Sequence, residues 1–293
     1  MNSVQPGILA PIPQLARYLT FSVTPGADPR PALRSLRAVS DGETVVIGLG
    51  EPLVRALGRA IDGLHSLPVY AGAGFEVPST PRALWCWLRG EDRGELLHRG
   101  RAVARALAPA FRVEEVVDAF RYGPSLDLTG YEDGTENPKD GEAVEAAAVQ
   151  GRGAGLDGSS FVAVQQWVHD LDRFESATPQ ERDHTIGRRK SDNEEIDDAP
   201  PSAHVKRVAQ ESFEPEAFIL RRSMPWSDET RAGLFFVAFG KSFDAFEALL
   251  GRMAGAEDGI SDALFTFTRP VSGGYFWCPP LAHGRPDLSA LGL

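Results

Sequence analysis

The chain has 293 residues, of which 42% are hydrophobic and 24% charged, the composition of a water-soluble globular protein with a substantial core. Its 41 acidic residues outnumber its 30 basic ones, which gives a formal net charge of -11. This balance disfavours nucleic acid and anionic membranes as partners, because both bind through basic patches. No apolar run approaches the ~20 residues that span a bilayer, and the first residues lack the pattern of a secretory signal.

The two cysteines, Cys86 and Cys278, are far apart in the sequence, and each has a tryptophan beside it. We interpret them as buried thiols in a reducing compartment, with a disulfide as the minor alternative. No Cys/His cluster has the spacing of a zinc site. Together with the absence of a signal, the cysteines predict a cytoplasmic protein.

In the first half of the chain, short β-branched or aromatic runs alternate with amphipathic stretches. Strands are predicted at residues 17–24, 44–50 and 83–90, the last of them buried on both faces because its apolar residues alternate only partly. Helices are predicted at residues 29–39, 51–61 and 94–111. The third helix has an apolar stripe of Leu96, Leu97, Val103, Ala104 and Leu107.

The second half begins after a glycine-rich join at residues 150–160. A strand is predicted at 160–170 and a helix at 171–187. Residues 233–253 repeat the strand–turn–helix order of residues 44–61, and residues 262–280 are rich in strand-forming residues.

Strands and helices alternate in both halves, but some strands follow one another directly, which favours an α+β fold over a doubly wound sheet. The two halves share an order of elements, although not their residues, and we therefore expect two modules, at residues 1–150 and 151–293. Modules of this kind expose sheet edges, so we also expect a homo-oligomer.

The stretch GYEDGTENP, from Gly130 to Pro138, is the first candidate site. Its glycines allow positive φ and its proline stops regular structure, so a turn is expected. Taken alone, Asp133 is explained as an acceptor within that turn. A calcium loop would need more oxygen ligands at alternating positions.

A second candidate site follows a long polar segment. Residues 187–204 are too long and too polar for an ordinary connection, and such loops are usually functional or disordered. His204 ends this segment after APPSA, where the prolines can hold the backbone rigid before a ligand. Further on, ILRRSMPW contains Arg221 and Arg222, which point to opposite sides if the segment is extended. Surface roles for the histidine and for both arginines are the alternative.

Taken together, GYEDGTENP, AHVKR and ILRRSMPW resemble the dye-decolorising peroxidase (DyP-type haem peroxidase) family, bacterial class B. The similarity extends over nearly the whole chain and includes IGRRKSDNEEIDD and ALWCWLRGEDRGELLHRGR. It implies an α+β fold of two ferredoxin-like modules, similar to a dimeric α+β barrel, with haem b in the C-terminal module.

The resemblance also implies roles for individual residues. The proximal iron ligand corresponds to His204, and its carboxylate partner to Asp262, for which a helix N-cap or a surface acid is the alternative. On the other face of the haem, Asp133 corresponds to a proton shuttle and Arg221 to the group that stabilises developing charge. Ser223 stands where some class B members have asparagine.

Further cofactor contacts follow from the same resemblance. Arg188 is expected either to pair with a haem propionate or to form a surface salt bridge. Leu234 and Phe236 alternate along one strand and are expected to form the apolar roof of the distal pocket. Ten tryptophans and tyrosines are candidate radical relays, although most are expected to be plain core residues.

The activity implied is that of a haem peroxidase, which reduces hydrogen peroxide via a ferryl porphyrin-radical intermediate and oxidises dyes, phenols or other one-electron donors. One alternative is a haem carrier or iron-release protein with incidental peroxidase activity, which would not need both Asp133 and Arg221. Another is a haem-free α+β oligomer in which His204 is only structural. Because some class B relatives are encapsulin cargo through a C-terminal extension, encapsulin is a further candidate partner, although PDLSALGL offers little room for such an extension.

Overall fold

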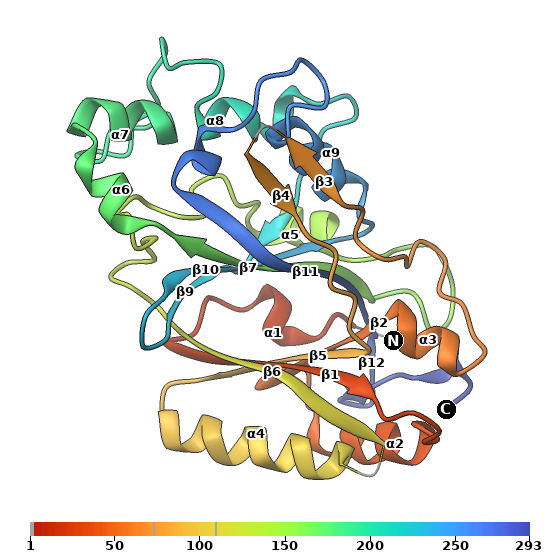
Figure 1. Ribbon diagram of the computed structural model, residues 1–293. Coiled ribbons are helices and arrows are strands. Elements are labelled where there is room, and N and C mark those ends of the chain that lie inside the picture. Colours follow the sequence, from red (N-terminus) through yellow and green to blue (C-terminus); the bar gives the residue numbers. More distant parts are fainter. Residues whose placement is uncertain (1–2, 73, 109) are drawn as a thin grey trace.

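The computed structural model describes residues 3–72, 74–108 and 110–293. Its fold is α+β, built on a sheet that closes on itself (Figure 1). The strand order is β7-β11-β2-β5-β1-β6-β9-β10-β8, and a further pairing between β7 and β10 completes a barrel of antiparallel strands, with β8 attached to β10. This confirms the α+β prediction.

The barrel is formed by strands from both halves of the chain: β1 (Leu15–Val23), β2 (Val45–Gly50), β5 (Leu84–Gly90), β6 (Phe111–Phe120), β7 (Ser160–His169), β8 (Leu220–Arg221), β9 (Met224–Ser227), β10 (Ala232–Gly240) and β11 (Thr268–Cys278). Two small hairpins lie outside it: β3 (Tyr70–Gly72) with β4 (Phe75–Val77), and β12 (Leu281–Ala282) with β13 (Arg285–Pro286).

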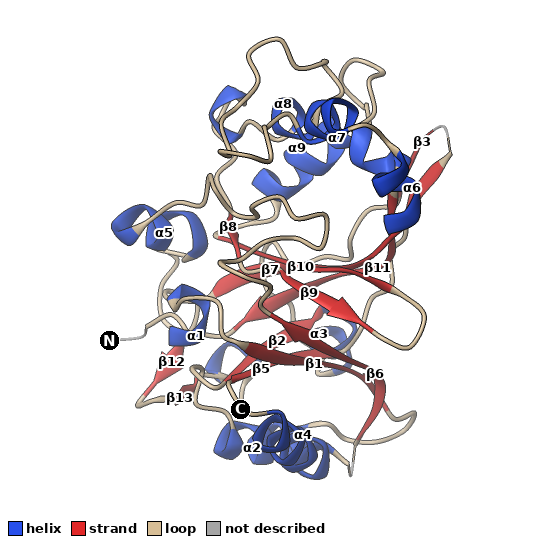
Figure 2. Cartoon of the chain, turned by 90° about the vertical axis from the view of Figure 1, so that its left-hand side faces the viewer, coloured by secondary structure: helices blue, strands red, loops and turns tan. Residues whose placement is uncertain are grey.

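Helices cover the barrel on opposite sides (Figure 2). On one side lie α2 (Arg30–Val39) and α4 (Arg93–Leu107), and on the other α6 (Leu171–Ser176), α7 (Pro179–Ile186), α8 (His204–Arg207) and α9 (Asp244–Met253). The remaining helices are α1 (Pro6–Leu9), α3 (Glu51–Ala56), α5 (Asp140–Ala147) and the 3₁₀ turns η1 (Gln210–Ser212), η2 (Ala263–Thr266) and η3 (Ser289–Leu291). In the part of the chain described, no helix has the length and apolarity needed to cross a membrane.

Strands β2 and β5 are buried on both faces, as was predicted for β5. In β5, Trp85 and Trp87 point into the barrel, whereas Cys86 and Leu88 pack on the side of the helices α2 and α4. Successive side chains of a strand point to opposite faces, so each face requires its own apolar set. Inside the barrel, Tyr18 of the first half stacks on Phe235 of the second, with ring centroids 3.9 Å apart. The two halves therefore share one core.

Several predicted boundaries were wrong. The helix expected at 94–111 ends at Leu107, because Phe111 already begins β6, a strand that the sequence analysis missed. Leu97, expected on the apolar stripe, is 45% exposed. The helix expected at 171–187 is two helices, because Thr178 caps a new helix that has Pro179 in its first turn. Cys86 and Cys278 are buried free thiols, as predicted.

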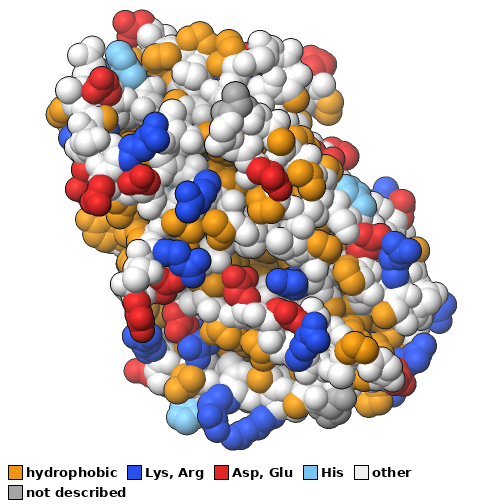
Figure 3. Space-filling model, viewed as in Figure 1, with side chains coloured by type: hydrophobic (Ala, Val, Ile, Leu, Met, Phe, Trp, Pro, Cys, Tyr) orange, Lys and Arg blue, Asp and Glu red, His pale blue; other side chains and the backbone are white. Residues whose placement is uncertain are grey.

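On the face drawn in Figure 3, acidic and basic side chains are interspersed, with no large basic area.

Candidate active site

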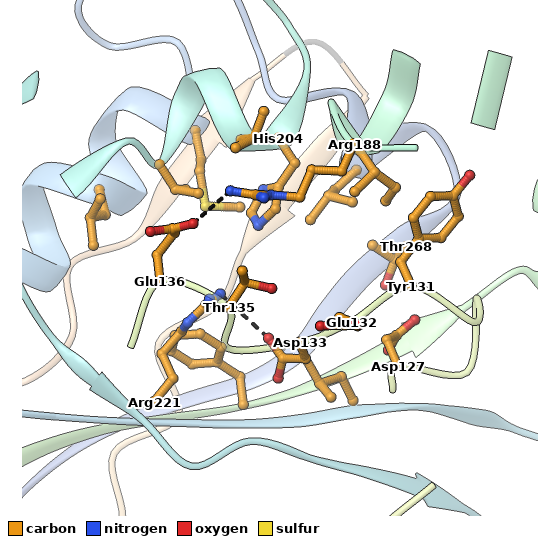
Figure 4. Close-up of a pocket in the computed structure, with 18 of the residues that line it drawn as sticks. Asp127, Tyr131, Glu132, Asp133, Thr135, Glu136, Arg188, His204, Arg221 and Thr268 are labelled. Carbon is orange, nitrogen blue, oxygen red and sulfur yellow. Dashed lines mark hydrogen bonds and ion pairs between the residues drawn. The ribbon is translucent and has the colours of Figure 1, made fainter. Parts of the chain in front are cut away.

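A cavity of about 270 Å³ lies between the barrel and the helical cap formed by α7, α8 and α9 (Figure 4). Strands β7 and β10 and the segment 127–136 provide part of its wall. Its polar lining consists of Asp127, Thr129, Tyr131, Glu132, Asp133, Thr135, Glu136, Gln165, His169, Arg188, Glu195, His204, Gln210, Glu211, Arg221 and Thr268. The cavity therefore brings together the segments GYEDGTENP, AHVKR and ILRRSMPW, which are far apart in the sequence.

His204 is the first residue of α8, and its ring projects into the cavity (Figure 4). Its Nδ1 atom lies 2.8 Å from Oδ2 of Asp262, whose side chain is fully buried. An ionised carboxylate can only accept a hydrogen bond, so Nδ1 carries a proton. In the neutral ring, Nε2 then presents a lone pair to the cavity.

The two carboxylate oxygens of Asp262 have different partners. One carboxylate oxygen accepts the hydrogen bond from His204, and the other accepts one from the backbone N–H of Leu264 at 2.8 Å, which caps η2. The cap holds the carboxylate in one orientation, and the carboxylate in turn fixes the imidazole ring.

Asp133 and Arg221 form an ion pair across the cavity from His204, with 3.4 Å between Oδ1 and Nη1 (Figure 4). Asp133 lies in the predicted turn, where Gly130 and Gly134 have φ of +84° and +79°. The turn is tied to β8 by Asn137, whose side chain accepts a hydrogen bond from the N–H of Arg221 at 2.7 Å and donates one to its carbonyl at 3.1 Å.

Asn137 was not singled out by sequence reasoning, although it belongs to GYEDGTENP. Asn137 is important because it contacts β8, which is far away in the sequence. No local sequence pattern indicates that contact. The side chain of Arg222 donates to the carbonyls of Ile8, Leu9 and Arg221, and it does not line the cavity.

Asp127 and His169 are a second polar pair in the cavity wall that the sequence analysis missed. His169 Nε2 lies 3.0 Å from Asp127 Oδ2, and its Nδ1 lies 2.6 Å from the hydroxyl of Thr268. Burial alone would raise the pKa of Asp127, but hydrogen bonds from His169 and Thr129 and the positive charge of His169 hold it below its usual range. This pair fastens the start of the segment 127–136 to the ends of β7 and β11.

The remaining predicted site residues are divided between the cavity and its surroundings. Arg188 lines the cavity and pairs with Glu136 at 2.6 Å and with Glu195 at 3.6 Å. Leu234 and Phe236 also line it, from β10. Ser223 does not: its buried hydroxyl accepts a hydrogen bond from the N–H of Val237 at 3.3 Å, and it borders a separate, much smaller cavity that Asp133 also borders.

The rest of the lining is largely apolar. Helix α9 contributes four apolar side chains to the lining: Phe246, Leu249, Leu250 and Met253. One buried donor in the wall has no protein partner: Nε2 of Gln165, a residue only 2% exposed. A buried donor without a partner costs free energy, so a ligand that accepts a hydrogen bond there would be favoured.

Residues 124–283, more than half of the chain, match the family described as Dyp-type peroxidase, C-terminal. The chain is 30% identical to the dye-decolorizing peroxidase of Mycolicibacterium paratuberculosis, over 99% of this chain and 88% of that protein. Among solved structures, a variant of DypB from Rhodococcus jostii RHA1 in complex with heme has a TM-score of 0.86 at 26% identity, covering 93% of this chain and 94% of that one.

The encapsulated DyP-type peroxidase from Mycobacterium smegmatis has a TM-score of 0.85 at 25% identity, covering 95% of this chain and 96% of that one. These matches cover nearly the whole chain. The chain belongs to the Dyp-type peroxidase family, and it is a peroxidase.

Proposed function

We propose that this protein binds haem b in the described cavity, reduces hydrogen peroxide there, and oxidises dyes, phenols or other one-electron donors. The observation that carries the proposal is the arrangement across the cavity. An imidazole with a free Nε2 lies on one side, and a carboxylate–guanidinium pair, Asp133 and Arg221, lies on the other. The heme in the related structure from Rhodococcus jostii supports the choice of cofactor.

The residues present fit this cofactor. Haem iron needs one strong axial donor, and a neutral imidazole whose other nitrogen is bound to a carboxylate is such a donor. The apolar side chains of α9 and β10 suit the faces of the porphyrin, and Arg188 would pair with a propionate by exchanging one of its partners, Glu136 or Glu195. The unpartnered Nε2 of Gln165 is an additional donor in the wall.

Most of these residues belong to the C-terminal segment 151–293. Only the turn with Asp133 and its neighbours comes from residues 1–150. We therefore retain the proposal of two ferredoxin-like modules with haem in the second, and with the first module supplying the proton-handling loop.

When bound, haem supplies the iron at which the O–O bond of peroxide is cleaved and the oxidising equivalents are held. With peroxide in the cavity, Asp133 would accept the proton from one peroxide oxygen and return it to the other, which leaves. Arg221 faces the same space, and its fixed positive charge stabilises the negative charge that develops on that leaving oxygen.

A haem carrier or iron-release protein is the other function considered. A carrier requires the axial imidazole, but it gains nothing from a carboxylate and a guanidinium held 3.4 Å apart on the opposite side. The family assignment also favours the enzyme.

The proposal is tested on the purified protein by its absorption spectrum and by peroxide turnover with several donors. We expect a Soret band and peroxide-dependent oxidation. His204→Ala should fold and retain little or no haem. A normal haem content and an unchanged Soret band in that variant would exclude His204 as the ligand, and a wild-type protein that binds haem without peroxide turnover would favour the carrier.

We also retain proposals on location and assembly. Two buried free thiols support a cytoplasmic location. Self-association is expected and is measured by light scattering. Encapsulation of the related protein from Mycobacterium smegmatis supports an encapsulin shell as a partner, which co-purification of the two proteins would test.

A further inference from the structure

The loop at residues 254–262 connects α9 to η2 and folds tightly on itself. The N–H of Asp262 donates a hydrogen bond of 2.8 Å to the carbonyl of Met253, so the two ends of the loop lie together. Gly255 has φ of +77°, and a Cβ atom at this position would lie 3.2 Å from the backbone of Gly259. Glycine adopts this backbone conformation without strain. The loop is therefore compact and keeps its side chains in place.

Two aspartates of this loop bind opposite ends of α8. Asp262 binds Nδ1 of His204, the first residue of the helix. Asp258 accepts two hydrogen bonds from the guanidinium of Arg207, the last residue, at 2.8 Å from Nη1 and 2.9 Å from Nη2. An isolated helix of four residues is not stable in water. The position of His204 therefore depends on contacts at both ends of α8.

Arg207 also joins α8 to the end of α9. Its guanidinium donates to the carbonyl of Arg252, at 3.2 Å from Nε and 2.6 Å from Nη2. This carbonyl lies in the last turn of α9, at the negative end of the helix dipole, where a cation is favourable. The side chain of Arg207 is only 5% exposed, and a buried guanidinium is costly unless its donors are paired. These contacts hold α8 against α9 (Figure 1).

We propose that Arg207 and Asp258 are positioning residues, which fix α8 so that Nε2 of His204 points into the cavity. Arg207 does not itself line the cavity, so it acts through His204. The proposal rests on the proposed function, in which Nε2 binds the iron. The two carboxylates of the loop have different tasks: Asp262 fixes the rotation of the imidazole ring, and Asp258, through Arg207, fixes the helix that carries the ring.

The chain contains a matched control pair. Arg17 and Asp118 also form a bidentate ion pair, with hydrogen bonds of 2.7 and 2.9 Å, and both side chains are largely buried. They join β1 to β6 on the side of the barrel that α4 covers, where a Cβ atom at Gly100 would lie 3.3 Å from Cδ of Arg17. Loss of this pair affects the stability of the barrel and leaves α8 intact.

The first test is hydrogen exchange of the haem-free protein. The N–H groups of Arg207 and Val208 donate within α8, to the carbonyls of Ala203 and His204. Because hydrogen bonds to charged groups are the strong ones, we expect Arg207→Ala to speed their exchange roughly tenfold or more. Arg17→Ala should leave these rates unchanged. Equal rates in Arg207→Ala and the wild type overturn the proposal.

The second test uses the haem-loaded protein, with two measurements: the rate of haem transfer to excess apomyoglobin, and the iron–imidazole stretching band of the ferrous form in resonance Raman spectra. Arg207→Ala should lose haem roughly tenfold faster or more, since partners that orient a metal ligand typically contribute this much to metal affinity. Its iron–imidazole band should shift or split, and Arg207→Lys, which keeps the charge but not the fork, should be intermediate. An unshifted band in Arg207→Ala, or the same shift in Arg17→Ala, overturns the proposal.

A double variant tests whether the two residues act as a pair. Haem loss in Arg207→Ala/Asp258→Ala should be about as fast as in Arg207→Ala alone, and additive effects would show that they act separately. If Arg207→Ala does not fold, Asp258→Asn replaces it, because it keeps the shape of the side chain and removes the charge. A wild-type protein without a Soret band would refute the proposed function, whereas the exchange rates of the haem-free protein still test the positioning of α8. If the wild type is a haem peroxidase and only the Arg207 results differ from expectation, the positioning role alone is wrong.

Discussion

Asp133 and Arg221 occupy the same side of the cavity, but they differ in how easily another group could replace them. A preorganised donor that stabilises charge is typically worth ~10²–10³ in rate, and general-base help ~10²–10⁴, so magnitudes alone do not rank them. Water can relay a proton in place of Asp133. The other arginine in the lining, Arg188, is already paired with Glu136 and Glu195, and Arg222 does not line the cavity.

We therefore predict that Arg221→Leu slows the reaction of the ferric protein with hydrogen peroxide more than Asp133→Asn does. Stopped-flow mixing of each haem-loaded variant with peroxide measures the two rates. If Asp133→Asn is the slower variant while both retain haem, the carboxylate is the indispensable group and the ranking is reversed.

Asp262 determines which nitrogen of His204 carries the proton. The Asp262→Asn side chain cannot accept from both His204 and Leu264 N–H with equal strength, because one of its two atoms is now a donor. His204 becomes a weaker donor to iron, so we expect the Fe(III)/Fe(II) reduction potential to rise and haem retention to weaken. Spectroelectrochemical titration measures the potential, and an unshifted value would count against this role for Asp262.

At the scale of elements, the packing of the C-terminal end of α7 against α8 positions His204. Gly187 ends α7 with φ of +93°, and a Cβ atom at this position would lie 2.2 Å from Cγ1 of Val205, the residue after His204. A side chain in this backbone region costs on the order of 1–3 kcal/mol, and the contact with Val205 adds to that cost.

We predict that Gly187→Ala lowers the melting temperature and weakens haem retention. Gly26→Ala is the control, because Gly26 has φ of +78° but no atom within 4 Å of the added Cβ. Gly26→Ala should lower the melting temperature only through the strain of its backbone, and it should leave haem retention normal. Equal effects of the two substitutions on haem would mean that the contact with Val205 does not position α8.

At the scale of the whole molecule, the barrel joins the two halves of the chain. Strand β2 pairs with β11 and β6 pairs with β9, so the ring closes only when both halves are folded. The core inside the barrel is likewise shared, as the contact between Tyr18 and Phe235 shows. Neither half can bury its inward-facing aromatic side chains alone.

We predict a single cooperative unfolding transition for the haem-free protein, despite the two-module order of elements. Differential scanning calorimetry should give a van't Hoff enthalpy close to the calorimetric one. Two separated transitions would show that residues 1–150 and 151–293 are independently stable units.

The sequence by itself determined the class of fold, most of the barrel strands and several of the residues that line the cavity. Strands with apolar side chains on both faces, such as β2 and β5, carry a strong local signal because burial on each face requires its own apolar set. The turn at Gly130–Pro138 is likewise local, since glycine and proline limit the backbone directly. His204, Asp133 and Arg221 were found by their resemblance to a family, and each of them lines the cavity.

Only the tertiary structure decided how these pieces meet. The closure of the barrel depends on pairings between distant strands, which no local pattern encodes. Asn137 anchors Arg221, His169 holds Asp127, and Arg207 donates to Asp258, each across more than 40 positions of sequence. Ser223 is only two positions from Arg221, but it borders the small cavity and does not line the main one. A residue's neighbours in space depend on the packing of the whole chain, and for these residues that packing decided the role.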